Sequence, residues 1–250
     1  MEELKQRVQK GYSRPWVVSK YSKVGLWPSE QLLCDKFWEP KSRILDLGCG
    51  AGRTTVPLAQ NGYRVVGMDL AIPMVYQAKR SAGFLGRNCV FGVCDATALP
   101  FPENSFTGIL FSYNGIELIP KQKVKQQVLE EALRILQPGG HLIFTTHAFE
   151  AFNKYAPARI QRLCLHLLNS ALGRNEPGAE VGEIIPKPTR TVEVYYMQIN
   201  SPRTYRKMIR NVGFELPYYN SRSRIDSQKR QSRLADFDPD FKFYVARKPE

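Results

Sequence analysis

The chain has 250 residues, of which 43% are hydrophobic and 24% are charged, and its formal net charge at pH 7 is +13. This length and composition are typical of one globular domain with additions, and because no run of 18 apolar residues occurs, a membrane-spanning helix is excluded. The charge leaves room for an anionic partner, but the lysines and arginines are spread along the chain, which favours solubility as their role.

The first residues of the chain and its cysteines indicate the cellular compartment of the protein. The first ten residues are mostly charged and contain no apolar stretch that could act as a signal peptide. The five cysteines have no CxxC spacing, which argues against a disulfide framework and against a zinc site. These features predict a cytoplasmic protein with no membrane partner and no bound metal.

The first forty residues differ from the rest of the chain. Residues 1–40 mix aromatic and charged side chains without a strand pattern, and they predict two short helices. The second helix is expected over Ser29–Phe37, with Pro28 directly before a serine N-cap. We expect this N-terminal helical segment to form a lid beside the main domain.

From residue 42 onward, short apolar stretches alternate with helical patterns. The strands predicted in chain order cover 43–48, 63–69, 89–96, 106–114 and 141–147. The helices predicted between them cover 53–60, 71–83 and 121–136. Such alternation predicts an α/β fold with a doubly wound parallel sheet.

Beyond residue 147 the alternation ends. The elements predicted there are a helix over 153–172, a strand over 191–199, a helix over 201–213, and last strands over 214–221 and 241–249. We interpret about residues 150–200 as an insertion after the fifth strand that covers the open end of the sheet like a lid. The basic run over 221–233 is expected to be a loop.

A glycine-rich loop, DLGCGAG over residues 46–52, joins the first predicted strand to its helix. Glycines at such a turn let the backbone approach a ligand and present N–H groups beside a helix N-terminus. The NAD fingerprint G-x-G-x-x-G needs a third glycine where Arg53 stands, and the GK[ST] run of a P-loop is absent. Phosphate binding is therefore disfavoured, and a smaller adenosyl ligand fits better.

The segment ILDLGCGAGRTT resembles the first motif of the class I S-adenosylmethionine-dependent methyltransferases, and the resemblance continues in register over about residues 40–148. It implies a Rossmann-like, mostly parallel sheet of seven strands in a methyltransferase domain over 41–250. It also implies S-adenosyl-L-methionine as the cofactor. Within this motif, the residues expected at the cofactor are Asp46, Gly48, Cys49 and Gly50.

Two acids follow the next two predicted strands. Asp69 ends the second strand, where the family places an acid that grips both ribose hydroxyls. Asp95 ends the third strand, where the family's acid or amide faces the adenine amino group. The chemistry fits independently, because a vicinal diol presents two donors and a carboxylate can accept both. Either acid taken alone would also fit a helix N-cap.

Four further residues complete the cofactor site that the resemblance implies. Leu70 and Ala96 follow the two acids, and Ser112 lies near the end of the fourth predicted strand. Met74 is placed to pack on the adenine ring, although a helix residue that faces the sheet could equally belong to the core. The sequence departs from the family at Thr107, where members carry aspartate, and we expect that acid to be structural.

The acceptor side is expected beyond the fourth and fifth strands. His147 ends the fifth strand, and an imidazole suits a general base at neutral pH, so His147 is the candidate catalytic residue. A structural role as a helix cap also remains open for it. The next candidates are Tyr113, Asn114 and Glu117. A base is needed only where the acceptor must lose a proton.

The function expected from these features is methyl transfer to an O or N atom of a small-molecule metabolite. The [DN]PP[YF] tetrad typical of enzymes that methylate amines of nucleic acids is absent, since residues 112–115 read SYNG. Two alternatives remain. The basic charge would suit an RNA methyltransferase, and a protein that only binds S-adenosylmethionine would carry the same motifs. The oligomeric state cannot be read from the sequence.

Overall fold

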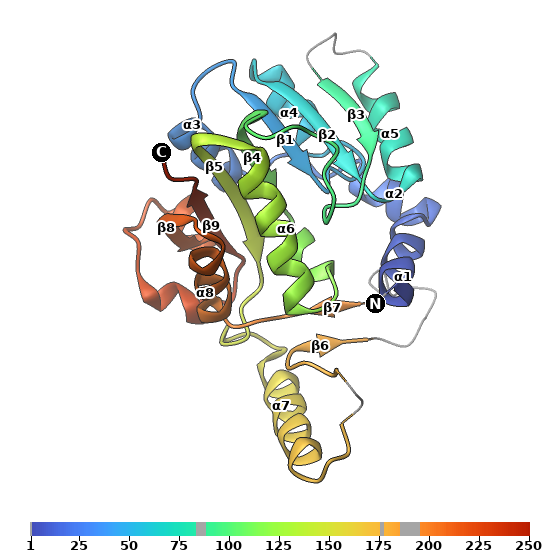
Figure 1. Ribbon diagram of the computed structural model, residues 1–250, viewed down its shortest axis with the longest axis vertical. Coiled ribbons are helices and arrows are strands. Elements are labelled where there is room, and N and C mark those ends of the chain that lie inside the picture. Colours follow the sequence, from blue (N-terminus) through green and yellow to red (C-terminus); the bar gives the residue numbers. More distant parts are fainter. Residues whose placement is uncertain (1, 84–88, 176–177, 186–195) are drawn as a thin grey trace.

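A sheet of seven strands lies at the centre of the protein (Figure 1), in a computed structural model that describes residues 2–83, 89–175, 178–185 and 196–250. The strands are β1 (Arg43–Leu47), β2 (Arg64–Asp69), β3 (Cys89–Val93), β4 (Phe106–Phe111), β5 (Leu136–Thr146), β8 (Glu215–Ser221) and β9 (Lys242–Arg247). Their order is β3-β2-β1-β4-β5-β9-β8. β1 to β5 are parallel, and β9 is antiparallel to both β5 and β8. The seven-stranded, mostly parallel sheet predicted from the sequence is therefore confirmed.

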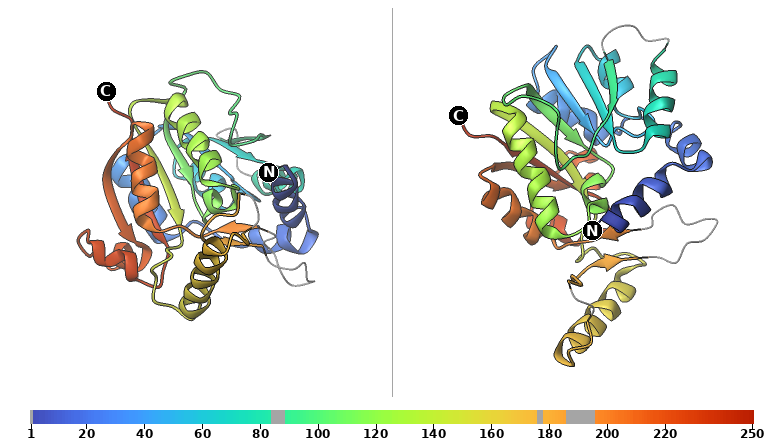
Figure 2. Two further views of the ribbon diagram at one scale, coloured as in Figure 1. Left: turned by 60° about the horizontal axis from the view of Figure 1, so that its bottom comes forward. Right: turned by 45° about the vertical axis from the view of Figure 1, so that its right-hand side comes forward.

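Helices cover both faces of this sheet (Figures 1 and 2). The α-helices are α1 (Glu2–Tyr12), α2 (Pro15–Tyr21), α3 (Pro28–Phe37), α4 (Thr55–Gln60), α5 (Ile72–Ala82), α6 (Gln122–Ile135), α7 (Ala156–Ala171), α8 (Pro202–Val212) and α9 (Arg222–Asp226). Two 3-10 helices are η1 (Gly115–Leu118) and η2 (Arg233–Phe237). Two short strands, β6 (Glu183–Ile184) and β7 (Met197–Gln198), pair with each other outside the main sheet.

The core lies in two layers, one on each side of the sheet. On the side of α6 and α8, buried side chains such as Phe144 and Ile209 form one cluster. On the side of α3, α4 and α9, a second cluster includes Leu33. Because successive strand residues point to opposite faces, β1 contributes Leu45 to the first cluster and Ile44 to the second.

The N-terminal segment forms three helices rather than the two predicted. Pro15 begins α2 at a position where its missing N–H costs nothing, so the chain starts a new helix shortly after α1 ends. The predicted serine cap of the next helix is also wrong. Pro28 is already inside α3, Trp27 is the N-cap, and the Glu30 side chain accepts a hydrogen bond from the Trp27 backbone N–H at 2.7 Å.

Two other boundaries differ from the sequence prediction. Part of the basic run expected as a loop forms the short helix α9, whose Ile225 is buried in the core cluster beside α3. The strand β5 begins at Leu136, directly after α6, and the Pro138-Gly139 pair lies inside it rather than before it. Gly139 has a φ of +75°, which lets the chain bend within the first part of β5.

The segment that follows β5 divides into two parts with different attachments. Around β6 and β7 it is held against α6, because Lys121 Nζ lies 2.6 Å from Glu183 Oε1 and the buried Lys125 donates to Gln198 Oε1 at 3.0 Å. Burial lowers the pKa of Lys125 to about 7. The helix α7 instead projects away from the body (Figure 2). Of the strand predicted over 191–199, residues 191–195 lie outside the described residues.

Candidate functional site

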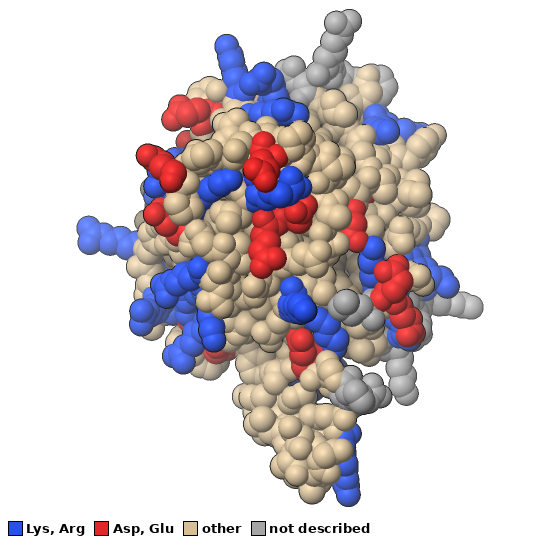
Figure 3. Space-filling view, in the orientation of Figure 1, with Lys and Arg blue, Asp and Glu red and all other residues tan. Residues whose placement is uncertain are grey.

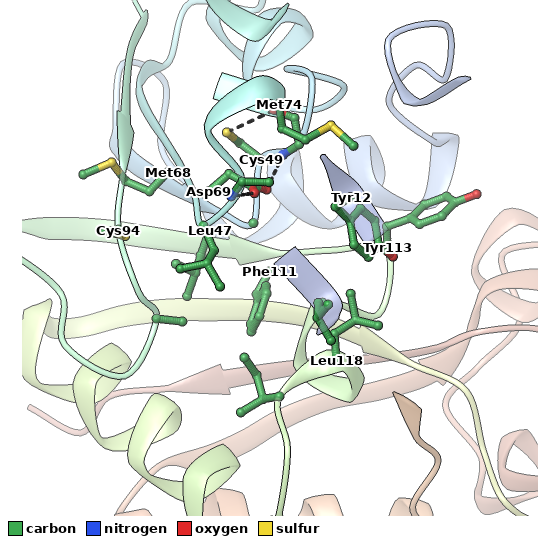
Figure 4. Close-up of a pocket in the computed structure, with 18 of the residues that line it drawn as sticks. Tyr12, Leu47, Cys49, Met68, Asp69, Met74, Cys94, Phe111, Tyr113 and Leu118 are labelled. Carbon is green, nitrogen blue, oxygen red and sulfur yellow. Dashed lines mark hydrogen bonds between the residues drawn. The ribbon is translucent and has the colours of Figure 1, made fainter. Parts of the chain in front are cut away.

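A cavity opens where the carboxyl ends of β1, β2, β3 and β4 meet, the edge at which open α/β sheets bind ligands (Figure 4). Its empty space amounts to about 1190 Å³, part of it open to solvent. Every residue expected from the sequence to contact the cofactor lines it. These residues are Asp46, Gly48, Cys49, Gly50, Asp69, Leu70, Met74, Asp95, Ala96 and Ser112. His147 is not among the residues that line this cavity.

The glycine-rich loop after β1 has a conformation that side chains rarely adopt. Gly48 and Gly50 have φ values of +67° and +54°. A Cβ at Gly48 would lie 3.1 Å from the Phe111 ring, a tight contact that adds to the preference of this positive φ for glycine. A Cβ at Gly50 would meet no atom within 4 Å, so it would project into open space. The backbone of Gly50 is therefore free to approach a ligand closely.

We predict that Gly50→Val weakens the binding of S-adenosylhomocysteine at least tenfold, about 1.4 kcal/mol or more, because the new side chain would enter the cavity. Isothermal titration calorimetry measures this. Gly62→Val is the matched control, since Gly62 also has a positive φ, +91°, with nothing within 4 Å, but does not line the cavity. If Gly50→Val and Gly62→Val bind S-adenosylhomocysteine equally weakly, backbone strain explains the loss of affinity, and not a side chain that occupies the cavity.

Asp69 lies between the glycine-rich loop and the start of α5 (Figure 4). Its Oδ2 accepts a hydrogen bond from the Gly50 N–H and its Oδ1 one from the Ala71 N–H, both at 2.8 Å. Burial raises the pKa of Asp69, and these backbone bonds oppose the rise. A carboxylate has about four acceptor positions, so two remain for a diol. Asp69 can therefore hold the loop and accept from a ligand at once.

Asp95 is engaged by the N-terminal helix. The Lys5 ammonium of α1 lies 2.5 Å from its Oδ2, and its Oδ1 accepts from the Thr97 N–H at 3.0 Å. Burial would raise the pKa of Asp95, but the bonds from Lys5 and Thr97 bring it below its ordinary value. No sequence pattern indicates this contact, because Lys5 and Asp95 are far apart along the chain.

Asp46 is almost fully buried, and its carboxylate is directed at the start of α4. Its Oδ2 accepts hydrogen bonds from the hydroxyls of Thr54 and Thr55, each at 2.5 Å. Burial raises the pKa of Asp46 to about 6, against the opposing effect of these two bonds. In this structure Asp46 therefore fixes the loop to the helix that follows it, although the residue also borders the cavity.

Met74 and Ser112 border the cavity but have other partners. Met74 is fully buried in a small cluster with Val17 and Val18 of α2. The Ser112 hydroxyl donates to the Glu30 carboxylate in a short hydrogen bond and accepts from Arg53 Nη2 at 3.1 Å. Both side chains therefore join the N-terminal helices to the wall of the cavity.

A buried ion pair between Glu30 and Arg53 belongs to this wall, since Arg53 also lines the cavity, and sequence reasoning missed the pair. Glu30 has 0% and Arg53 7% of its surface exposed, and their side chains form two hydrogen bonds, of 2.9 and 2.5 Å. Arg53 also donates to the Gly25 carbonyl at 2.8 Å. The pair ties α3 and the segment before it to the glycine-rich loop. The one available signal was the arginine that replaces the third glycine of the NAD fingerprint.

His147 forms a dyad with Glu117 next to the cavity. His147 Nδ1 lies 2.6 Å from Glu117 Oε2, and the His147 backbone N–H donates to the other carboxylate oxygen at 2.9 Å. Glu117 is fully buried, whereas the His147 side chain is 34% exposed. Burial lowers the pKa of His147, but the charge and hydrogen bond of Glu117 outweigh it and raise that pKa above the usual 6.5. This arrangement fixes the ring and leaves Nε2 for another partner.

A row of aromatic rings connects the cavity with His147. Neighbouring ring centroids along it lie 5.5 Å apart for Tyr21 and Tyr113, 5.1 Å for Tyr113 and Trp27, 5.0 Å for Trp27 and Phe241, and 4.9 Å for Phe241 and His147. Tyr113 has a φ of +53°, so a strained turn after β4 directs it into the row. We call these residues, without His147, the aromatic row.

A family model described as a methyltransferase domain matches residues 44–140 of this chain. A demethylmenaquinone methyltransferase of Renibacterium salmoninarum is 33% identical over 116 residues, 46% of this chain and 46% of that protein. A ubiquinone/menaquinone biosynthesis C-methyltransferase of Cronobacter sakazakii is 28% identical over 191 residues, 71% of this chain and 68% of that protein. The chain spans less than half the length of the first curated relatives that it matches.

Solved structures share the fold over most of the chain. An S-adenosylmethionine-dependent methyltransferase of Methanosarcina mazei superposes with a TM-score of 0.69 at 20% identity, covering 90% of this chain and 99% of that one. Geranyl diphosphate C-methyltransferase of Streptomyces coelicolor superposes with a TM-score of 0.58 at 16% identity, covering 87% and 77%. At these identities the likeness establishes the fold.

Proposed function

We propose that this chain, whose residues 44–140 match a methyltransferase domain, acts as a class I S-adenosylmethionine-dependent methyltransferase and transfers the methyl group of S-adenosylmethionine to a small-molecule acceptor. The observation that carries the proposal is the cavity at the strand ends, where the open side of Gly50 and the carboxylate of Asp69 face the same space. A glycine that permits close approach and an acceptor for two hydroxyls are what an adenosyl ligand requires.

The residues present fit this cofactor. Asp69 keeps two acceptor positions for the ribose hydroxyls, and Asp95 lies one strand further along the same edge to meet the adenine. Leu70, Met74 and Ala96 supply apolar surface around the base. The cofactor supplies a methyl group on a cationic sulfur, which is a good leaving group. The chain therefore contributes mainly alignment and the exclusion of water.

We propose that His147 removes a proton from the acceptor. Glu117 holds Nδ1, so the neutral imidazole can accept the proton at Nε2 while the acceptor atom forms its bond to the methyl carbon. Bound S-adenosylmethionine would supply this methyl group, and its sulfur would keep the electron pair of the carbon–sulfur bond that breaks. The products are the methylated acceptor, S-adenosylhomocysteine and a protonated His147. Glu117 stabilises the imidazolium by its charge.

The aromatic row supports a flat, apolar acceptor. Its rings lie between the cavity and His147, and stacking on aromatic faces favours planar molecules. The sequence favoured transfer to oxygen or nitrogen, and the relative named as a C-methyltransferase adds an activated carbon to these candidates. A base at His147 suits a hydroxyl or an acidic C–H, both of which must lose a proton.

The test of cofactor binding is Asp69→Ala. This change removes the acceptor for two hydroxyls, each charge-assisted bond being worth about 1.5–3 kcal/mol, so S-adenosylhomocysteine should bind at least about tenfold more weakly. Calorimetry measures the affinity, and circular dichroism checks the fold. Asp35→Ala is the control, since Asp35 is exposed and outside the cavity. Unchanged affinity in a folded Asp69→Ala variant would remove the assignment.

We also propose that the N-terminal helices act as a lid over the cofactor. Lys5 is paired with Asp95, and Gln9 Nε2 donates to the Leu70 carbonyl at 3.1 Å, so α1 closes one side of the cavity. A ligand beneath α1 would add contacts to it, and we expect slower proteolytic cleavage over residues 10–28 when S-adenosylhomocysteine is present. Equal cleavage rates with and without it would contradict the lid.

Two other functions remain as alternatives, and each predicts a distinct experimental result. RNA methylation would use the basic side of α8, where Arg203, Lys207 and Arg210 border a groove. It predicts that the purified protein retains nucleic acid and releases it as salt is raised. A protein that only binds the cofactor would do so with full affinity and consume none in the presence of any acceptor.

A further inference from the structure

The helix α7 carries an apolar face that nothing within the described part of the chain covers. Ile160, Cys164, Leu167, Leu168 and Ala171 are spaced at i, i+4, i+7, i+8 and i+11, so they share one side of the helix, and all five are exposed. Ile160 has 58% of its surface exposed and Leu167 and Leu168 each have 56%. An amphipathic helix normally buries such a face, and a contiguous exposed apolar face indicates an interaction site.

The helix is anchored so that this face stays outside the body. Arg159, which is buried, donates from Nε to the Phe149 carbonyl at 2.9 Å and from Nη1 to Asn153 Oδ1 at 3.0 Å. These bonds join the first turn of α7 to the segment after β5. The rest of the helix projects beyond the sheet and the other helices in all three ribbon views (Figures 1 and 2). A protruding ridge on the protein can lie against a flat partner, whereas a groove could not.

The charge around this face is of one sign. From residue 151 to residue 175 the sequence contains no aspartate or glutamate. Lys154, Arg162 and Arg174 are exposed along the same stretch, and Figure 3 shows the projecting part as largely uncharged surface with blue side chains at its edge. Two copies of this chain joined through α7 would bring these like charges together. An anionic surface would complement them.

We propose that α7 docks the protein onto an anionic lipid surface, with its apolar face among the acyl chains and its cations at the headgroups. None of the helices that the structure describes has the length and apolar character needed to cross a bilayer, so the docking is peripheral. The sequence analysis predicted no membrane partner because the chain contains no apolar run long enough to span a bilayer. A surface helix with separate apolar and basic sides does not meet that criterion.

The experiment is co-sedimentation of the full chain with vesicles of phosphatidylcholine, with and without phosphatidylglycerol. We expect binding to the anionic vesicles and weaker binding as salt is raised. The double variant Leu167→Ser/Leu168→Ser should bind at least about tenfold more weakly. Arg162→Gln should lower binding roughly fivefold, in line with the value of one cation at such a surface. Val90→Ser is the matched control, since Val90 is 63% exposed on β3 and should bind as the parent does.

A fluorophore on Cys164 gives a second readout. Of the five cysteines Cys164 alone is exposed, and it lies on the apolar face, so an environment-sensitive label there should shift to the blue on anionic vesicles. Affinity for S-adenosylhomocysteine should be unchanged in every variant, which separates this proposal from that of the cofactor site. No binding to either vesicle, or equal binding by Leu167→Ser/Leu168→Ser, would overturn it. A lipid-free dimer that this double variant dissociates would assign the face to a second copy instead.

Discussion

His147→Asn should lower turnover by about 10²–10⁴-fold while leaving the affinity for S-adenosylhomocysteine unchanged. Asparagine keeps a polar side chain near Glu117 but has no nitrogen that accepts a proton at neutral pH. Cofactor binding should survive because His147 is not among the residues that line the cavity. The measurement is steady-state kinetics with an acceptor identified by screening with a labelled methyl donor, together with calorimetry.

The pH dependence of this activity has a defined sign. The base form of His147 is the neutral imidazole, and Glu117 raises its pKa above 6.5. The rate should therefore fall as the pH drops through that raised pKa, and the fall should begin above pH 6.5. Glu117→Gln removes the charge that raises the pKa, so the acidic limb should move to lower pH. A role of Glu117 in stability alone would leave the limb in place.

The control for this experiment is His141→Asn. His141 lies in the middle of β5, where it pairs with Arg247 of β9, and it does not line the cavity. Its replacement should change turnover by no more than a few-fold. If His147→Asn also retains turnover within a few-fold of the parent, the base lies elsewhere or the acceptor needs none.

Arg53→Ala should lower the free energy of unfolding by about 3–5 kcal/mol. The substitution would leave the fully buried Glu30 carboxylate with only the Trp27 N–H and the Ser112 hydroxyl as partners. A buried charge that loses its counter-ion is costly because no water replaces the lost interaction. Urea unfolding followed by circular dichroism measures the change.

Two variants test whether the buried charge is the cause. Arg247→Ala breaks the ion pairs of Arg247 with Glu215 and Glu250. The Arg247 and Glu215 side chains are 32% and 56% exposed, so the change should cost at most about 1 kcal/mol. Glu30→Gln combined with Arg53→Met removes both charges and should recover a large part of the loss. If Arg53→Ala costs no more than Arg247→Ala, the pair does not hold α3 to the glycine-rich loop.

The amino-acid sequence by itself determined the sheet and the edge at which the cavity lies. Apolar stretches with the period of buried strands alternate with helical patterns, and this signal is local, so β1 to β4 were predicted close to their observed bounds, whereas β5 begins at Leu136, well before its predicted start. The strand pattern also predicts that Asp69 and Asp95 lie at the same edge of the sheet, since parallel strands bring their carboxyl ends to one edge. The glycines between β1 and α4 also predicted the turn there correctly from the sequence, because positive φ values favour glycine.

Only the tertiary structure decided which side chains meet. Glu30 and Arg53, Lys5 and Asp95, and Glu117 and His147 each come from different elements, and no spacing along the chain encodes their contacts. The same holds for the aromatic row, whose rings come from three separate parts of the chain. The periodicity of α7 likewise revealed an apolar face without its surroundings. A sequence period fixes which residues share a side of a helix, whereas burial depends on what the rest of the chain brings against that side.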